Sequence, residues 1–216
     1  MTFQCFFICA LSLFCLQTND YSVFAKAKIH SVNYLAWVNR DQSISIKASG
    51  KLVQHIINKE LSGDGGISDL IFLDFDGDGY KDLVIEYLSN VPGISDLLIY
   101  DHVNNRFSKV KDFSKYPAPI RIPNSHIYYS YHRSGCADSD WDSDLFKIVN
   151  EKATTIGTIS GRDCDEVEKG IFVYCCRQSG KQLIKKMSLQ KLNNYKDTKW
   201  GLIADYWKHN YKKFQQ

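Results

Sequence analysis

The sequence lacks the motifs by which most catalytic sites are recognised. It has no GxSxG, HExxH, P-loop or Rossmann glycine pattern, and its six histidines are scattered without pairing. Strong charge of one sign is also missing, because 27 Lys and Arg against 24 Asp and Glu leave a net charge of +3. That charge is too small to predict nucleic-acid binding. These absences favour a protein that is not an enzyme and that binds no nucleic acid.

Apolar runs long enough to span a bilayer are missing as well. The run from Phe6 to Leu16 is shorter than the roughly 20 residues that a membrane-spanning helix needs. Small residues follow it, with a cleavage site at Val23-Phe24-Ala25 or Ala25-Lys26-Ala27, so residues 1–27 are predicted to be a signal peptide. A lipoprotein is disfavoured because Phe14 precedes Cys15. The mature chain, residues 28–216, is then expected in the periplasm or outside the cell, with no transmembrane segment.

The mature chain keeps four cysteines, and an even number in an exported protein favours disulfides. Cys136 and Cys164 are the preferred pair because each stands at a polar turn beside a strand-like segment. Cys175 and Cys176 are adjacent, and neighbouring side chains of a strand point to opposite faces. One is expected to be a buried thiol and the other a partner for a different cysteine, so their pairing is left open.

Short apolar runs at period two, separated by turn residues, begin at Val32 and continue to Met187. This pattern predicts a mainly β fold, with antiparallel hairpins in a small propeller-like or sandwich arrangement and a single domain over residues 28–216. The segment 111–124 contains Pro117, Pro119 and Pro123 and is predicted to cross the surface.

The C-terminus shows a different period. Apolar residues recur at helical spacing, and Asp197 or Thr198 could cap the start of a helix. The stripe is expected to pack against the sheet; it comprises Leu202, Ile203, Tyr206, Trp207, Tyr211 and Phe214.

Carboxylates alternate along the stretch from Asp74 to Asp82, with a glycine at its sixth position. A hard cation such as Ca²⁺ takes six to eight oxygen ligands. Most of these could come from Asp74, Asp76, Asp78, the Tyr80 carbonyl and Asp82. An EF-hand is disfavoured because its twelfth position needs a Glu and is Ile85 here, and because the flanks are strand-like. The stretch therefore predicts a calcium loop that closes a β-hairpin.

A second ladder of acids comprises Asp138, Asp140, Asp142 and Asp144. It has no glycine turn, so a solvated strand face or an acidic loop is the favoured interpretation. Whether it forms a second metal site is left open.

The run from Leu73 to Leu83 resembles the calcium loop of FG-GAP/VCBS-type repeats, which occur in integrin α-chain propellers and in many exported bacterial proteins. The wider layout, over residues 67–165, adds the stretch from Tyr128 to Cys136 and Trp141. It is similar to exported bacterial proteins with a small propeller-like β fold. Some of these are periplasmic immunity proteins or lysozyme inhibitors.

This resemblance implies Ca²⁺ as a cofactor and a protein partner, namely an effector that degrades the cell wall. In lysozyme inhibitors a loop containing Ser-Gly enters the cleft of the enzyme, and here the matching residues are His132, Arg133, Ser134 and Gly135. Two alternatives stay open. One is a carbohydrate- or cell-surface-binding module that stacks sugars on Trp141, Tyr128 and Tyr129. The other is a cell-wall or glycan hydrolase.

Overall fold

Alternation of apolar and polar residues produces fifteen named strands in the computed structural model, which describes residues 22–63, 65–164 and 168–215. Period two places apolar side chains on one face of each strand, and sheets then bury those faces by stacking. Every pair of named strands in the described ranges is antiparallel. The mainly β fold predicted from the pattern is therefore confirmed.

The first two sheets each have four strands in sequence order. The first sheet comprises β1 (Phe24–Ile29), β2 (Val32–Val38), β3 (Ile44–Ala48) and β4 (Lys51–Ile56). After the short 3₁₀ helix η1 (Asn58–Glu60), the second sheet comprises β5 (Ile67–Leu73), β6 (Asp82–Tyr87), β7 (Ser95–Asp101) and β8 (Arg106–Lys109).

The third sheet has seven strands in the order β15-β14-β13-β12-β10-β9, and β11 also pairs with β12. Its strands are β9 (Ile120–Arg121), β10 (Ile127–Tyr129), β11 (His132–Gly135), β12 (Asp140–Val149), β13 (Lys152–Arg162), β14 (Gly170–Arg177) and β15 (Gly180–Met187). The remaining elements are η2 (Phe113–Lys115), η3 (Cys136–Asp138), η4 (Leu189–Asn194), the helix α1 (Lys199–Asn210) and η5 (Tyr211–Phe214).

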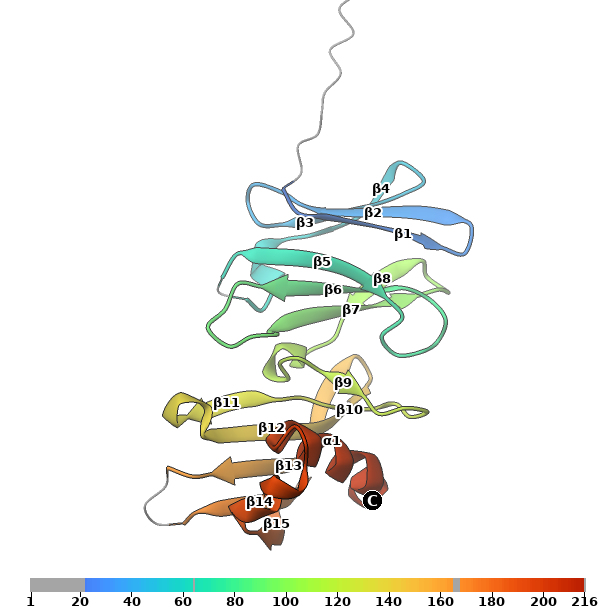
Figure 1. Cartoon of the computed structure of the whole chain (residues 1–216). Coiled ribbons are helices and arrows are strands. Elements are labelled where there is room, and N and C mark those ends of the chain that lie inside the picture. Colours follow the sequence, from blue (N-terminus) through green and yellow to red (C-terminus); the bar gives the residue numbers. More distant parts are fainter. Residues whose placement is uncertain (1–21, 64, 165–167, 216) are drawn as a thin grey trace, which may run out of the picture.

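The three sheets lie as successive layers, and α1 packs against the third sheet (Figure 1). One apolar cluster joins the first two sheets, a second joins the second and third sheets, and a third joins the third sheet to the C-terminal helices. The second sheet is covered on both faces. Leu83 and Ile85 belong to the cluster between the first and second sheets, and Val84 belongs to the cluster between the second and third sheets. In the described ranges no sheet closes into a barrel, and the stack matches a sandwich-like arrangement.

Two chain segments differ in setting from the simple expectation. Residues 24–27, the end of the predicted signal peptide, form the first part of β1, which pairs with β2 from Phe24↔Trp37 onward. The rest of the predicted signal peptide, up to residue 21, lies outside the described residues. The segment 111–124 is not a plain surface crossing, because Phe113, Tyr116 and Ile122 are buried. Phe113 and Tyr116 fill the space between the second and third sheets.

The C-terminal stripe packs as predicted. Leu202, Ile203, Trp207 and Phe214 are buried against the third sheet. The indole Nε1 of Trp207 donates a hydrogen bond to Ser143 Oγ at 2.9 Å. Thr198 occupies the N-cap position but makes no side-chain capping hydrogen bond. No helix among the described residues is long and apolar enough to cross a membrane.

Replacing Trp207 with alanine tests whether this packing supports the third sheet. The side chain has no exposed surface, so its loss should leave a cavity and lower the free energy of unfolding by about 3–5 kcal/mol. Chemical denaturation measures the change. Leu183→Ala is the control, because that side chain is 49% exposed on β15 and should cost less than about 1 kcal/mol. Equal losses in the two variants would contradict the assignment.

Candidate functional site

The acidic loop predicted from the sequence lies between β5 and β6. The ladder between these strands ends at Leu73↔Asp82, so residues 74–81 form the connection outside the sheet. A second loop, residues 102–105, connects β7 and β8 at the same end of the sheet. The Tyr80 ring stacks on His102 with centroids 4.7 Å apart, which places the two loops side by side.

Three of the five predicted ligands converge. Carboxylate oxygens of Asp74, Asp76 and Asp78 lie within 4.8 Å of one another. Backbone amides hold the first of them, because Gly77 N donates to Asp74 Oδ1 at 2.7 Å and Gly79 N donates to Asp74 Oδ2 at 3.2 Å. Both glycines have left-handed backbones, with φ of 78° and 91°, a conformation that glycine adopts at little cost. The loop therefore curls around its own carboxylates.

Electrostatics at this cluster favours a positive partner. Burial raises the pKa of Asp76, and the nearby carboxylates of Asp78 and Asp74 raise it further. Arg121 on β9 acts in the opposite direction. Its guanidinium lies against the loop, so that a Cβ added at Gly77 would come within 1.8 Å of Arg121 Nη1. Like-charged groups held this close are suited to bind a hard cation.

The other two predicted ligands have different surroundings. Asp82 is fully buried at the start of β6, where Oδ2 accepts a hydrogen bond from Phe75 N and Oδ1 accepts one from Tyr100 N, both at 2.9 Å. It does not belong to the group of three converging carboxylates. Tyr80 was predicted to offer only its main-chain carbonyl; its ring packs between His30 and His102.

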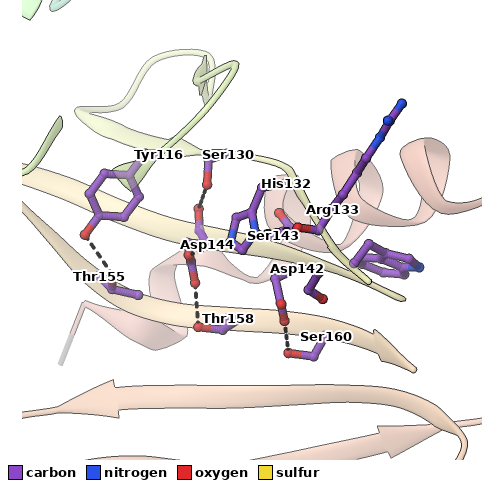
Figure 2. Close-up of polar contacts among 12 residues, drawn as sticks. Tyr116, Ser130, His132, Arg133, Asp142, Ser143, Asp144, Thr155, Thr158 and Ser160 are labelled. Carbon is purple, nitrogen blue, oxygen red and sulfur yellow. Dashed lines mark hydrogen bonds and ion pairs between the residues drawn. The ribbon is translucent and has the colours of Figure 1, made fainter. Parts of the chain in front are cut away.

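The carboxylates of the second acid ladder form hydrogen bonds and ion pairs with other side chains and amides of the protein. Asp142 is bound by the Arg162 guanidinium, whose Nη2 lies 2.8 and 3.0 Å from the two carboxylate oxygens, and it accepts a hydrogen bond from the Ser160 hydroxyl. Asp144 accepts a hydrogen bond from Thr158 Oγ1 at 2.7 Å (Figure 2). These contacts run between β12 and β13 and stabilise their pairing.

The two remaining acids of the ladder hold the exposed turn beyond β11. Asp140 Oδ1 accepts hydrogen bonds from the amides of Asp163 and Cys164. Asp138 Oδ2 lies 2.7 Å from Lys199 Nζ, and the Tyr131 hydroxyl donates to the same carboxylate. All four carboxylates of the ladder thus have protein partners in the described part of the chain and are partly buried, so they do not form the solvated strand face that the sequence favoured.

The predicted partner-binding residues form β11 and lead into an exposed turn. His132 is half-buried, whereas residues 133–137 are exposed. Figure 2 shows the Arg133 side chain pointing away from Asp142 and Asp144, and that side chain is 57% exposed. Ser134 Oγ accepts a hydrogen bond from Arg162 Nη1 at 3.1 Å. The segment is therefore accessible but attached to β13.

The backbone of this turn is strained and is held from several sides. Cys136, Ala137 and Asp138 have φ of 50°, 48° and 78°, in the left-handed region that L-residues adopt at a cost of about 1–2 kcal/mol each. The predicted disulfide between Cys136 and Cys164 is confirmed, with Cα atoms 6.2 Å apart. The cross-link and the Lys199–Asp138 ion pair fix both ends of the strained stretch.

Several residues at this site escaped the sequence-based prediction. A cavity of about 200 Å³ borders the segment, lined by Tyr131, Arg133, Asp138 and Trp200 together with Val91, Pro92, Ala118 and His132. The Tyr131 and Trp200 rings lie 3.8 Å apart between centroids. Trp200, Lys199 and Arg162 stand far along the chain from β11, so no local pattern could have assigned them to it.

The aromatic residues of the carbohydrate-binding alternative are not available for stacking on sugars. Trp141 and Tyr128 are each only 1% exposed, and they belong to the apolar clusters on the two faces of the third sheet. Tyr129 is partly buried against the cluster that contains Trp141. The expectation of an exposed aromatic face is therefore wrong for this trio, because period two directs both Tyr128 and Trp141 into cores.

The structure shows the surroundings of the adjacent cysteines, Cys175 and Cys176. Cys175 is buried in the core under the third sheet, as expected for one of the pair. Cys176 is half-buried, and its Sγ lies 3.6 Å from Thr158 Oγ1. Both are free thiols, so the expectation that one pairs with another cysteine is wrong within the described residues.

The His132–Asp144 pair is expected to make the free energy of unfolding depend on pH. Nε2 of His132 lies 3.6 Å from Asp144 Oδ2, and this carboxylate raises the pKa of the imidazole above its usual 6.5, against the opposing effect of burial. A raised folded-state pKa stabilises the protein below about pH 6.5, and this contribution is lost as pH rises through the folded value.

His132→Gln should therefore reduce the loss of unfolding free energy between about pH 6 and 8, as measured by chemical denaturation at each pH. His126→Gln removes an exposed imidazole and is the matched control. If the two variants change the pH profile equally, His132 does not have this role.

Comparison with known proteins gives a likeness of fold. No family model matches this chain, and no curated protein matches it. Five chains of solved structures match, among them a Xanthomonas type IV secretion system related protein. That protein is 13% identical, the alignment covers 77% of this chain and 95% of that chain, and the TM-score is 0.52. The chain is thus similar in fold, at low identity, to a protein related to a secretion system.

Proposed function

We propose that this protein is an exported, calcium-binding β protein that binds another protein, and that its partner is an enzyme that degrades peptidoglycan. The observation that carries the proposal is the segment at residues 133–138, which is exposed over 133–137, is strained over 136–138, and is held by a disulfide, an ion pair and a hydrogen bond from β13. Strained, over-determined backbone concentrates at binding and catalytic sites. A rigid protruding segment also loses little conformational entropy on binding, which favours affinity.

The chemistry of Arg133 fits the cleft of such an enzyme. Most glycosidases cleave their substrate with a pair of carboxylates, so their clefts are acidic. An exposed guanidinium can bind a carboxylate through two hydrogen bonds. The side chain of Arg133 is 57% exposed and lies 3.8 Å from Asp138, which leaves it able to turn toward a partner. The segment His132–Gly135 also contains the Ser-Gly pair of the resemblance described above.

Calcium in this proposal has a structural role. The converging carboxylates of Asp74, Asp76 and Asp78 supply hard oxygen ligands. The Tyr80 carbonyl is a further ligand in this proposal, and Asp82 holds the loop to the sheet through the hydrogen bonds that it accepts from Phe75 N and Tyr100 N. The loop lies in the second sheet, whereas the exposed segment belongs to the third. We therefore assign stability to the loop and recognition to the segment. The similarity of fold to a protein related to a secretion system supports an exported protein that interacts with other proteins.

Calcium binding is tested by thermal melting. At millimolar Ca²⁺, a loop with a Kd near 10 μM would stabilise the fold by about 2.7 kcal/mol, which corresponds to roughly 5–11 °C in Tm. Chelation should remove this gain from the wild-type protein, and Asp78→Ala should abolish the calcium dependence. Asp69→Ala on β5 removes the same charge from an exposed carboxylate outside the loop, so the Tm of this variant should still depend on calcium. A wild-type Tm that does not change with chelator would refute the calcium assignment.

Recognition is tested by inhibition of lysozyme-type muramidases acting on purified cell walls, including any such enzyme encoded beside this chain. The wild-type protein should inhibit at least one, and Arg133→Glu should weaken inhibition tenfold or more, because it places a carboxylate against an acidic cleft. Arg177→Glu, an equal charge change on the exposed end of β14, should have little effect.

Two results would contradict this assignment. One is no inhibition of any tested enzyme, and the other is equal weakening by Arg133→Glu and Arg177→Glu. Release of cell-wall fragments by the protein alone would instead support the hydrolase alternative. Both variants should melt within about 1–2 °C of the wild type, since exposed substitutions of this kind change stability little.

A further inference from the structure

The outer face of the first sheet has an unusual composition. Its inner face packs on the second sheet through residues such as Ala36, Ile44 and Ile46. The opposite face follows from the registers Lys26↔Leu35, Leu35↔Lys47 and Lys47↔Leu52, which form one row across all four strands. Phe24 and Lys28 continue the same face along β1. In Figure 1 this sheet is the layer at the opposite end of the stack from α1, so its outer face has no neighbouring layer.

Positive charge is concentrated in this layer. Residues 24–57 contain one acidic residue, Asp41, and five basic ones, which are Lys26, Lys28, Arg40, Lys47 and Lys51. Residues 58–216 contain 22 of each sign. The positive net charge of the whole chain therefore arises from the first sheet.

The lysines of the outer face have no acidic partner among the described residues. No ion pair involves Lys26, Lys28 or Lys47 there; instead, Lys26 Nζ lies 5.5 Å from the Phe24 ring centroid and Lys47 Nζ lies 5.1 Å from that of Trp37. These three lysines line a shallow pocket with a volume of about 440 Å³, together with Asn33, Leu35 and Gly50. The charge is thus gathered in one place without being neutralised.

Exposed apolar side chains accompany the lysines. Phe24 is 50% exposed and Leu52 is 58% exposed, and both belong to the outer face. A surface that combines lysines with exposed apolar side chains, and that has no acids, matches the boundary of a membrane, where anionic headgroups overlie an apolar layer.

We propose that the outer face of the first sheet docks on a surface of anionic phospholipid. Lys26, Lys28 and Lys47 contact the headgroups, and Phe24 and Leu52 enter the interface beside them. The charge is spread over two strands, β1 and β3, which suits an extended surface of one sign. The exposed segment at residues 133–137 belongs to the third layer, with the second sheet between, so it stays accessible in this orientation. The inference is independent of the function proposed above.

The test is co-sedimentation with vesicles of phosphatidylcholine alone or with about 30% phosphatidylglycerol. The readout is the difference in binding between the two vesicle types. An attached apolar leader would bind both types equally and would not change this difference. The wild-type protein should bind the anionic vesicles more tightly, and the difference should vanish as salt rises from about 50 to 500 mM. Reversing three charges in K26E/K28E/K47E should lower binding more than about 50-fold, since each lysine near such a surface is worth about fivefold.

The matched control is K191E/K196E/K208E, which reverses three exposed lysines at the opposite end of the stack and should keep the binding. Circular dichroism should show that both variants are folded. Equal binding to the two vesicle types, or equal loss in the two variants, would overturn the proposal. Binding to soluble polyglutamate at low salt without binding to vesicles would overturn it in favour of an acidic protein partner.

Discussion

The buried carboxylate of Asp82 is the constraint on which the arrangement of the middle layer depends. It connects the acidic loop to the sheet, because Phe75 N donates to one oxygen and Tyr100 N, on β7, donates to the other. Burial raises the pKa of this group to about 7, since ionisation is costly away from water. A cation among Asp74, Asp76 and Asp78 would favour the ionised form, which accepts both hydrogen bonds best. Metal binding and hairpin geometry would then reinforce each other.

The same loop joins the second layer to the third. Phe75 stacks on Tyr128 of β10, with ring centroids 4.8 Å apart, and Arg121 of β9 lies against Gly77. Because the second sheet is buried on both faces, a change in the loop affects two apolar clusters at once. The position of the third sheet, which carries the exposed segment, is therefore set partly by a loop in another layer. A structural calcium ion would stabilise this interface as well as its own hairpin.

Features with a local signal could be predicted from the sequence. Period-two runs gave the strands, helical spacing gave α1, and polar turns beside strands gave the disulfide partners Cys136 and Cys164. Features that depend on long-range contacts could not. The burial of Trp141 requires a helix about sixty residues later to cover its face, and the Lys199–Asp138 pair joins the same distant segments. At residues 24–27 a small-residue cleavage pattern and an edge strand share the same short stretch, so local composition alone does not separate the two.

Conformational strain in the exposed turn needs support from outside it. Three successive non-glycine residues in the left-handed region cost several kcal/mol in total, at about 1–2 kcal/mol each, and would relax if the turn were free. The disulfide to Cys164 fixes the start of the stretch, while Lys199, the first residue of α1, fixes its end through Asp138. The helix is in turn held by Trp207 and its neighbours in the core beneath the third sheet. Core packing at the C-terminus therefore maintains the shape of a surface segment formed by a different part of the chain, and that shape is the one a partner would meet already ordered.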